Sequence, residues 1–172
     1  MKKITLLKLL KENRVIMNLK DEKLTEEHAR EIATWKYEGK YQIYNLPEWE
    51  TMIKEKYSLC NETGRNRFTA YINEKDELVG FINLLDEGEK IFFGIGVNPR
   101  YCNQGIGKII TKLGLNKCKI KFPNKPVILE VRTWNNRAIN CYKSQGFEIV
   151  EKKHQETYIG KGEFYVMRYI NN

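Results

Sequence analysis

The stretch from Val97 to Lys108 constrains the possible folds of this chain more than any other part of its sequence. An apolar run, Ile91 to Val97, predicts a buried strand that ends at Asn98, and a polar loop with Gly105 and Gly107 leads directly into a helical pattern. The first N–H groups of a helix have no partner within it, and the helix dipole makes this end positive. A strand, a glycine loop and a helix N-terminus are typical of a phosphate site, although the same junction also serves as a tight turn without a ligand.

The spacing within this stretch excludes two common nucleotide-binding motifs. A P-loop requires Ser or Thr directly after its Gly-Lys pair, and here Gly107-Lys108 is followed by Ile109. A dinucleotide fingerprint requires a third glycine three residues after the second, where this sequence has Ile110. Neither nucleotide-binding fold is therefore expected.

Two segments resemble the GNAT family of N-acetyltransferases. The run from Pro99 to Gly107 resembles the family's acetyl-CoA pyrophosphate loop, which usually reads Arg or Gln, two residues, and then Gly-x-Gly or Gly-x-Ala. The run from Trp134 to Phe147 is similar to the family's Asn-x-x-Ala-x-x-x-Tyr segment with its following Gly-Phe, at the expected distance and in the expected order. The resemblance covers about residues 90–150, and the loop departs from the family pattern at Cys102 and Asn103.

This resemblance implies an α+β protein with the GNAT acyl-CoA N-acyltransferase fold. Such a fold has a central mixed, mostly antiparallel sheet, a parallel βαβ core and about four helices. The implied cosubstrate is acetyl-CoA (coenzyme A), whose pantetheine pairs with the strand before the glycine loop, and no metal is implied. The residues expected to bind the cofactor are Ile95, Val97, Cys102, Asn103, Gln104, Gly105, Ile106, Gly107, Lys108 and Asn135. Asn135 is equally explained as a helix N-cap, and the two roles are compatible.

Acetyl transfer to an amine requires a base for the amine, donors for the tetrahedral oxyanion and a proton for the leaving thiolate. Tyr142 is the candidate acid because it lies four residues after Ala138, which matches the family's thiol-protonating tyrosine. The alternative is a core tyrosine whose hydroxyl is hydrogen-bonded within the fold.

Glu130 is the candidate base. In the strand predicted over 127–131, alternation puts it on the face opposite the neighbouring apolar residues, where a carboxylate is costly unless it is paired or functional. The string Leu-Glu-Val-Arg at 129–132, with Tyr142 following, also resembles ribosomal-protein alanine N-acetyltransferases, in which the matching glutamate is the base. The alternative is an ion pair with Arg132 or a lysine, and Asp86 and Glu87 are weaker candidates for the base.

The segment from Trp35 to Tyr44 is unusually aromatic for a connection between helices. In GNAT proteins this connection often lines the acceptor site, which implies that Trp35, Tyr37 and Tyr41 form part of its wall. The alternative is that these rings only pack two helices together.

The periodicity and turn residues predict the order of the remaining elements. We expect a strand over 15–19, a helix capped by Thr25, a second helix from Pro47 to about 58, a polar loop over 61–66 and a hairpin of strands 68–72 and 78–82. A helix from 105 to about 121 follows, with Ile106, Ile109, Ile110, Leu113 and Ile120 on its apolar stripe. A parallel strand, a helix ending at Gly146 and a hairpin of strands 147–157 and 163–170 complete the chain.

The composition is that of a soluble globular protein. The 172 residues, 41% hydrophobic, suffice for a single domain over 1–172, and one hypothesis is that residues 1–16 are a dispensable N-terminal extension. The chain shows neither a membrane-spanning run nor a signal-peptide cleavage site, so we expect a cytoplasmic protein with no membrane partner. Its four cysteines form no Cys-x-x-Cys pair and its two histidines are isolated, which predicts free thiols and no metal site.

The formal net charge of +8 is compatible with nucleic-acid binding, with a polyanionic cofactor or with solubility alone. No nucleic-acid motif accompanies the charge, so we do not expect a nucleic-acid partner. Several lysines follow the glycine loop, which suits the phosphates of coenzyme A. These lysines are Lys108, Lys112, Lys117, Lys119 and Lys121.

The sequence thus predicts an N-acetyltransferase that moves an acetyl group from acetyl-CoA directly to a primary amine. The acceptor is left open among a peptide or protein N-terminus, a polyamine, an aminoglycoside and a small metabolite, and the protein is expected to be a monomer or a homodimer. The alternative function is a non-catalytic acyl-CoA-binding regulatory domain.

Overall fold

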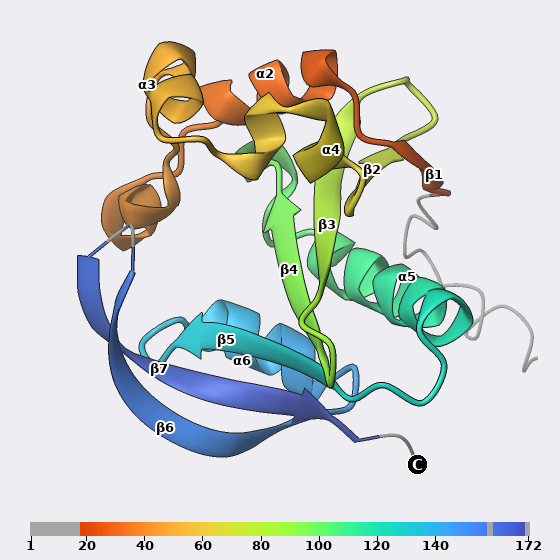
Figure 1. Ribbon diagram of the computed structural model, residues 1–172, viewed down its shortest axis with the longest axis vertical. Helices are drawn as coiled ribbons and strands as arrows, with labels where there is room; N and C mark the ends of the chain where they lie inside the picture. The colour runs from red at the N-terminus through yellow and green to blue at the C-terminus, as the bar shows by residue number, and fades with distance from the viewer. Residues whose placement is uncertain (1–17, 158–159, 171–172) are drawn as a thin grey trace, which may run out of the picture.

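The computed structural model describes residues 18–157 and 160–170, which fold around a seven-stranded sheet (Figure 1). The strands are β1 (Lys20–Lys23), β2 (Phe68–Ile72), β3 (Leu78–Asp86), β4 (Ile91–Val97), β5 (Val127–Arg132), β6 (Phe147–Thr157) and β7 (Gly160–Tyr169). Their order in the sheet is β1-β2-β3-β4-β5-β7-β6. β4 and β5 are parallel and the other neighbouring pairs are antiparallel, which confirms the predicted mixed, mostly antiparallel sheet.

The helices cover both faces of this sheet. The α-helices are α2 (Glu26–Thr34), α3 (Trp49–Lys54), α4 (Glu62–Arg65), α5 (Ile106–Lys121) and α6 (Asn136–Lys143), and the 3₁₀ helices are η1 (Gly39–Tyr44), η2 (Ser58–Cys60) and η3 (Pro99–Tyr101). One buried cluster joins α2 and α3 to one face of the sheet, and a second joins α5 and α6 to the other face. None of the helices in the described ranges combines the length and the apolarity needed to cross a bilayer.

The N-terminal region differs from the prediction. The first strand within the described residues is β1, a charged edge strand paired with β2, and Leu19, the end of the predicted strand, lies outside it. Residues 15–17 and the hypothetical extension at 1–16 lie outside the described residues, and Asn18 and Leu19 precede β1. The prediction missed β1 because it looked for apolar residues, whereas edge strands commonly carry charged side chains.

The helical region before β2 is more broken than predicted. α2 begins after Thr25 as expected, and the Thr25 hydroxyl accepts a hydrogen bond from His28 N at 3.2 Å. The second helix is shorter than predicted, because Lys56 takes a left-handed conformation with φ of 58° just after α3. The predicted polar loop over 61–66 contains the single turn α4, capped by the Asn61 side chain.

The parallel unit β4–α5–β5 is present as predicted, but α5 turns a different face to the sheet. The Ile120 side chain is 84% exposed, which contradicts its place on the predicted apolar stripe. At about 100° per residue, the buried face of α5 is centred on the small residues Gly114 and Cys118. A Cβ added to Gly114 would lie 2.8 Å from the Phe93 ring, so the helix approaches the sheet most closely along its small side chains, and the bulky isoleucines flank this line.

The C-terminal hairpin extends the sheet beyond β5. β7 pairs with β5 and β6 pairs with β7, so the last strand of the chain lies inside the sheet. β7 begins at Gly160 and not at the predicted Glu163, and residues 158–159 of the turn lie outside the described residues. Gly146, with φ of 95°, turns the chain from α6 into β6, as predicted.

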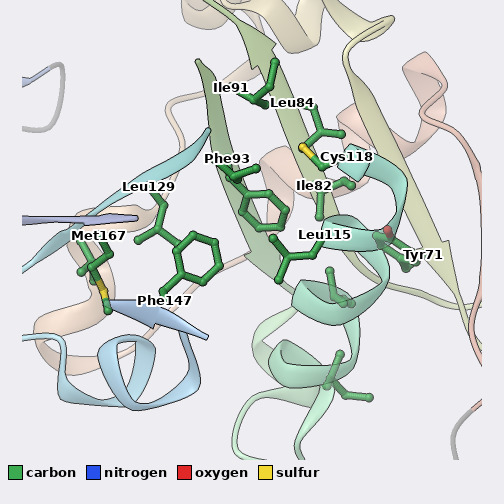
Figure 2. Packing of buried hydrophobic residues seen from close by; sticks show 14 of the residues in the cluster. Tyr71, Ile82, Leu84, Ile91, Phe93, Leu115, Cys118, Leu129, Phe147 and Met167 are labelled. Atoms are coloured by element: carbon green, nitrogen blue, oxygen red, sulfur yellow. The ribbon is translucent and has the colours of Figure 1, made fainter. Parts of the chain in front are cut away.

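The core on the α5 side continues across the sheet from β3 to β7 (Figure 2). Phe93 of β4 is 2% exposed, and its ring centroid lies 6.1 Å from that of Phe147 in β6. Leu129 and Met167, on β5 and β7, are buried in the same cluster. Phe93 therefore connects the two halves of the sheet through side chains.

We expect Phe93→Ala to lower the free energy of unfolding by about 3–5 kcal/mol, because it leaves a cavity between α5 and the sheet. Urea denaturation followed by circular dichroism measures this change. The control is Ile120→Ala, which should stay within about 0.5 kcal/mol of the wild type because its side chain is exposed. A large loss in the control would show that the last turn of α5 packs as the sequence pattern had predicted.

Candidate active site

A gap opens in the middle of the sheet where β4 and β5 part. The two strands are paired only at Ile91–Val127 and Phe92–Ile128, and they diverge beyond that point (Figure 1). On the other side of β4, Asn98 N donates to Val79 O at 2.9 Å. Because backbone groups alternate in direction along a strand, this register turns the N–H and C=O groups of Ile95 and Val97 away from β3 and toward the gap.

A cleft of about 1710 Å³ passes through this gap. Its walls come from β3, β4, the glycine loop, α5, β5 and α6, together with the aromatic segment before α3. All the residues predicted to bind the cofactor line it: Ile95, Val97, Cys102, Asn103, Gln104, Gly105, Ile106, Gly107, Lys108 and Asn135. Glu130 and Tyr142 line it as well, so the structure brings these predicted residues together around one space.

The glycine loop is held against the turn between β2 and β3. The Asn98 side chain donates to Leu78 O at 3.0 Å and accepts from Arg100 N at 3.1 Å. The Tyr101 hydroxyl donates to the Glu77 carboxylate, which also accepts from Asn73 Nδ2 at 2.8 Å. These contacts fix the loop from outside the cleft and leave its inner side free to face a ligand.

The N-terminus of α5 has the backbone geometry of an anion site. Asn103 and Gly105 have φ values of 63° and 82°, so the chain curls in left-handed conformations before the helix. Lys108 N and Ile109 N both donate to Gly105 O. The N–H groups of Ile106 and Gly107 precede these first helical bonds and are the donors that a helix start leaves for a ligand.

The aromatic segment contacts both sides of the gap. The Tyr37 hydroxyl donates to Val97 O at 2.8 Å, and burial raises the pKa of Tyr37. Asn135 caps α6 by accepting from Ala138 N at 3.2 Å, and its Nδ2 donates to the Tyr44 hydroxyl at 3.1 Å. The N-cap role proposed for Asn135 is therefore present, and the same residue lines the cleft.

The three aromatic residues predicted for the acceptor wall differ in position. Trp35 and Tyr37 line the cleft, and Trp35 lies 6.0 Å from the Phe81 ring. Tyr41 is not a lining residue: its ring packs 5.7 Å from Trp134 and lies 4.1 Å from the Arg137 guanidinium. The prediction of Tyr41 is corrected to a packing role, because η1 turns its side chain toward α6.

Glu130 lies on the face opposite the core, as strand alternation predicted. Its carboxylate accepts from Lys153 Nζ at 2.6 Å and from Gln155 Nε2, both of which belong to β6. The alternative of a lysine ion pair is therefore present. The weaker candidate Asp86 binds Lys125 at 2.7 Å and does not line the cleft, and Glu87 does not line it either.

Tyr142 lies on the α6 side of the gap. Its ring centroid is 6.0 Å from that of Phe147, and the residue packs against the core on this side. Burial raises the pKa of Tyr142, so its hydroxyl is protonated at neutral pH. Cys102 and Cys141 also line the cleft, and burial raises the pKa of both thiols.

The family model described as Acetyltransferase (GNAT) family matches residues 26–147, which is more than half of the chain. The chain belongs to the GNAT acetyltransferase family. This match confirms the resemblance carried by the two sequence motifs, and enzymes of the GNAT family use acetyl-CoA. A mycothiol acetyltransferase of Mycolicibacterium smegmatis is 30% identical over 86 residues, which cover 48% of this chain and 29% of that protein. The chain thus spans less than a third of the length of this relative.

Solved GNAT structures share the fold at low sequence identity. A chimera of the spermidine N-acetyltransferase SpeG of Vibrio cholerae with hSSAT has a TM-score of 0.73 and 16% identity, over 88% of this chain and 95% of the other. The ribosomal-protein-S18-alanine N-acetyltransferase of Escherichia coli has a TM-score of 0.63 and 18% identity, over 88% and 93%. The Vibrio cholerae spermidine N-acetyltransferase in complex with CoA and spermine has a TM-score of 0.61 and 16% identity, over 87% and 94%. These neighbours confirm the GNAT fold.

Several residues of this GNAT cleft were not found from the sequence. Tyr44, Phe81, Asn83 and Arg67 line the cleft from η1, β3 and the start of β2. Phe81 and Asn83 alternate on one face of β3, but the predicted strand ended at 82 and its inward face was not assigned. Arg67 carried no signal, because a single arginine before a strand is ordinary on a protein surface.

We expect Tyr101→Phe to lower the free energy of unfolding at neutral pH and to lose this effect in acid. The pKa of Glu77 is lowered because Asn73 and Tyr101 donate hydrogen bonds to its carboxylate. A carboxyl with a lowered folded-state pKa stabilises the fold above its unfolded pKa, and this contribution is lost as the pH falls through the folded pKa. Urea unfolding of wild type and variant over a series of pH values measures the difference. In a Glu77→Gln background the effect of Tyr101→Phe should no longer depend on pH, and a pH dependence that persists there would refute this assignment.

Proposed function

We propose that the chain transfers an acetyl group from acetyl-CoA directly to a primary amine. The observation that carries this proposal is the continuity of the cleft, which extends from the N-terminus of α5 through the gap between β4 and β5 to Glu130 and Tyr142. A donor held by the glycine loop and an acceptor on the opposite face of the sheet would meet at this gap.

The start of α5 fits the phosphates of coenzyme A. The donors are the N–H groups of Ile106 and Gly107, and the side chains of Lys108 and Lys112 line the same part of the cleft. Toward the gap, the N–H and C=O groups of Ile95 and of neighbouring β4 residues would pair with the amide groups of pantetheine, as a missing strand would. Acetyl-CoA would supply the activated thioester, and the remaining chemistry belongs to side chains and backbone groups of the chain.

Glu130 would take the proton of the attacking amine. It is the one carboxylate among the residues that line the cleft. Lys153 and Gln155 hold the carboxylate in place through hydrogen bonds to its two oxygens. Each carboxylate oxygen has two lone-pair sites, so both oxygens can still accept a further hydrogen bond.

Val97 N would donate a hydrogen bond to the oxyanion, and Tyr142 would supply the proton for the leaving thiolate. The Val97 carbonyl is taken by the Tyr37 hydroxyl, whereas its N–H is directed toward the gap, where an oxyanion would form. Tyr142 remains protonated at neutral pH and would give its proton to the leaving thiolate. The raised pKa of Cys102 and Cys141 keeps both thiols protonated, which favours direct transfer over a covalent thioester on the enzyme.

We expect Lys108→Gln and Lys112→Gln each to weaken acetyl-CoA binding several-fold at low ionic strength, with a smaller loss at high salt. Both lysines line the cleft, and exposed charge–charge attraction is screened by salt. Lys117→Gln is the matched control, because Lys117 pairs with Asp21 and is not among the residues that line the cleft. Calorimetry with each variant measures the dissociation constants. Equal losses in all three variants would point to long-range attraction and not to a phosphate site.

We expect Tyr142→Phe and Glu130→Gln each to reduce kcat by about 10²–10⁴-fold while acetyl-CoA still binds, because each variant removes one proton-transfer group. Free-thiol release with a panel of primary amines measures turnover. Tyr41→Phe is the control and should stay within about twofold of the wild type, because Tyr41 packs outside the cleft. Loss of acetyl-CoA binding in the two variants would show a structural role in place of a catalytic one.

The same assay also tests the second candidate function, a non-catalytic acyl-CoA-binding regulatory domain. The ion pair of Glu130 with Lys153 favours that candidate, whereas the position of Tyr142 in the wall of the cleft favours the enzyme. Binding of acetyl-CoA without turnover of any amine would select the regulatory function. Failure to bind acetyl-CoA would refute both functions.

A further inference from the structure

The charges along the cleft point to the class of acceptor. The ionisable Lys, Arg, Asp and Glu side chains that line it are Arg67, Lys108, Lys112, Glu130, Arg132 and Arg137. Glu130 is the single acidic side chain in this set, and its carboxylate is already bound by Lys153 and Gln155. A polyamine needs several carboxylates to replace the water around its ammonium groups. This cleft does not provide them, although spermidine N-acetyltransferases share its fold.

Arg67 is a basic residue that lines the cleft together with Phe68 and Phe81. Its Nη2 donates to Ser58 Oγ at 2.9 Å, and its guanidinium lies 5.4 Å from the Phe68 ring centre. Its Nε is buried and has no hydrogen-bond partner, and no ion pair joins Arg67 to a carboxylate in the described part of the chain. Burial also lowers the pKa of Arg67, because the charge loses water without gaining a counter-ion.

The other arginines of this region have different surroundings. Arg132 donates to the carbonyls of Lys161 and Gly160 and lies 4.8 Å from the Phe164 ring centre. Arg65 donates to Leu59 O and lies near Glu26. The Arg132 Nε is likewise buried without a hydrogen-bond partner, but both terminal nitrogens of Arg132 donate to carbonyls. The Arg137 guanidinium lies 4.1 Å from the Tyr41 ring centre. Arg67 donates only through Nη2, to Ser58, so its other donors are available to a ligand.

The register places Arg67 at some distance from the reacting atoms. Leu84 N donates to Arg67 O, and Leu84 is paired with Phe93 of β4. The backbone of Arg67 therefore lies two strands away from β4, level with Phe93. With about 4.8 Å between strands and about 3.4 Å per residue from Phe93 to Val97 along β4, the two backbones are separated by roughly 17 Å. An arginine side chain covers part of this distance, which leaves roughly 10 Å between a group bound by Arg67 and an amine at the gap.

The surface between these two points is aromatic. Trp35, Phe68 and Phe81 form a contiguous group, with Phe81 lying 6.0 Å from Trp35 and 5.9 Å from Phe68, and all three line the cleft. Such a surface suits the apolar middle of a ligand and does not suit a second charge.

We propose that the acceptor is an extended primary amine whose far end carries an anionic group bound by Arg67, with an apolar middle against Trp35, Phe68 and Phe81. The proposal rests on the proposed function, since it names the substrate class of the same site. The shared chemistry is a carboxylate about 10 Å from a primary amine. A free ω-amino acid and the N-terminus of a peptide with an acidic third residue both have this chemistry.

The first experiment compares three acceptors of equal length: 8-aminooctanoate, octylamine and 1,8-diaminooctane. Their kcat/KM values are measured by thiol release, and their affinities for the CoA-loaded protein by calorimetry, so that the test does not depend on turnover alone. We expect 8-aminooctanoate to exceed both other amines by about tenfold or more, because a charge-assisted hydrogen bond to arginine is lost in each of them. Equal values for the three amines, or a preference for the diamine, would overturn the proposal.

The second experiment removes the guanidinium. In Arg67→Gln the preference for 8-aminooctanoate over octylamine should fall at least tenfold, and Arg67→Lys should recover part of it because it keeps the charge without the fork of donors. Arg30→Gln is the matched control, because Arg30 pairs with Glu26 outside the cleft, and its preference should equal that of the wild type. A preference unchanged in Arg67→Gln would refute the role of this residue, whatever the acceptor.

The third experiment separates the two sources of the anion. The amidated tripeptide Ala-Ala-Glu is compared with Ala-Ala-Gln, again by turnover and by binding to the CoA-loaded protein. Two preferences are compared: that for Ala-Ala-Glu over Ala-Ala-Gln and that for 8-aminooctanoate over octylamine. A larger preference between the peptides assigns the acceptor to peptide N-termini, and a larger preference between the octyl compounds assigns it to small ω-amino acids. Failure to bind acetyl-CoA would instead refute the proposed function, which distinguishes that result from the loss of carboxylate preference alone.

Discussion

The parting of β4 from β5 is the constraint on which the rest of the site depends. Two strands that stayed paired along their length would satisfy each other's backbone groups and close the sheet. Here β5 is paired with β7 over most of its length, and β4 is paired over its full length only with β3. The inner groups of Ile95 and Val97 are thus left for Tyr37 and for a ligand. Because a βαβ unit connects the two strands, the same parting brings the start of α5 to the mouth of the gap.

A sheet that opens in its middle must be held together elsewhere, and the core does this on one face. Phe93 reaches from β4 to Phe147 of β6, and Gly114 allows α5 to lie directly on that contact. Hydrogen bonds provide a second support at the glycine loop, where Asn98 and Tyr101 bind the β2–β3 turn. The residues that shape the site are therefore supported from outside the cleft, so their positions are set before a ligand binds.

Much of this arrangement could be predicted from the sequence, and the failures have physical causes. The strand, glycine loop and helix around Gly105 are local patterns, and so is the alternation that turned Glu130 away from the core; all of these were correct. The stripe of α5 was wrong at Ile120, because hydrophobicity cannot show where small side chains allow closer packing than large ones. The partners of Glu130 on β6 and the position of Arg67 depend on the pairing of distant strands, which no local pattern reports.

The two residues proposed for proton transfer lie in different surroundings. Tyr142 is surrounded by apolar side chains on the α6 side of the gap, where burial keeps its hydroxyl neutral. Glu130 is on the other face, where its carboxylate lies 2.6 Å from the ammonium nitrogen of Lys153. A sheet with unbroken pairing would shield these two groups from each other, whereas the gap lets a ligand touch both. Acid and base roles are divided between two residues when their environments differ, and here the fold separates the environments of Tyr142 and Glu130 by placing them on opposite faces of one sheet.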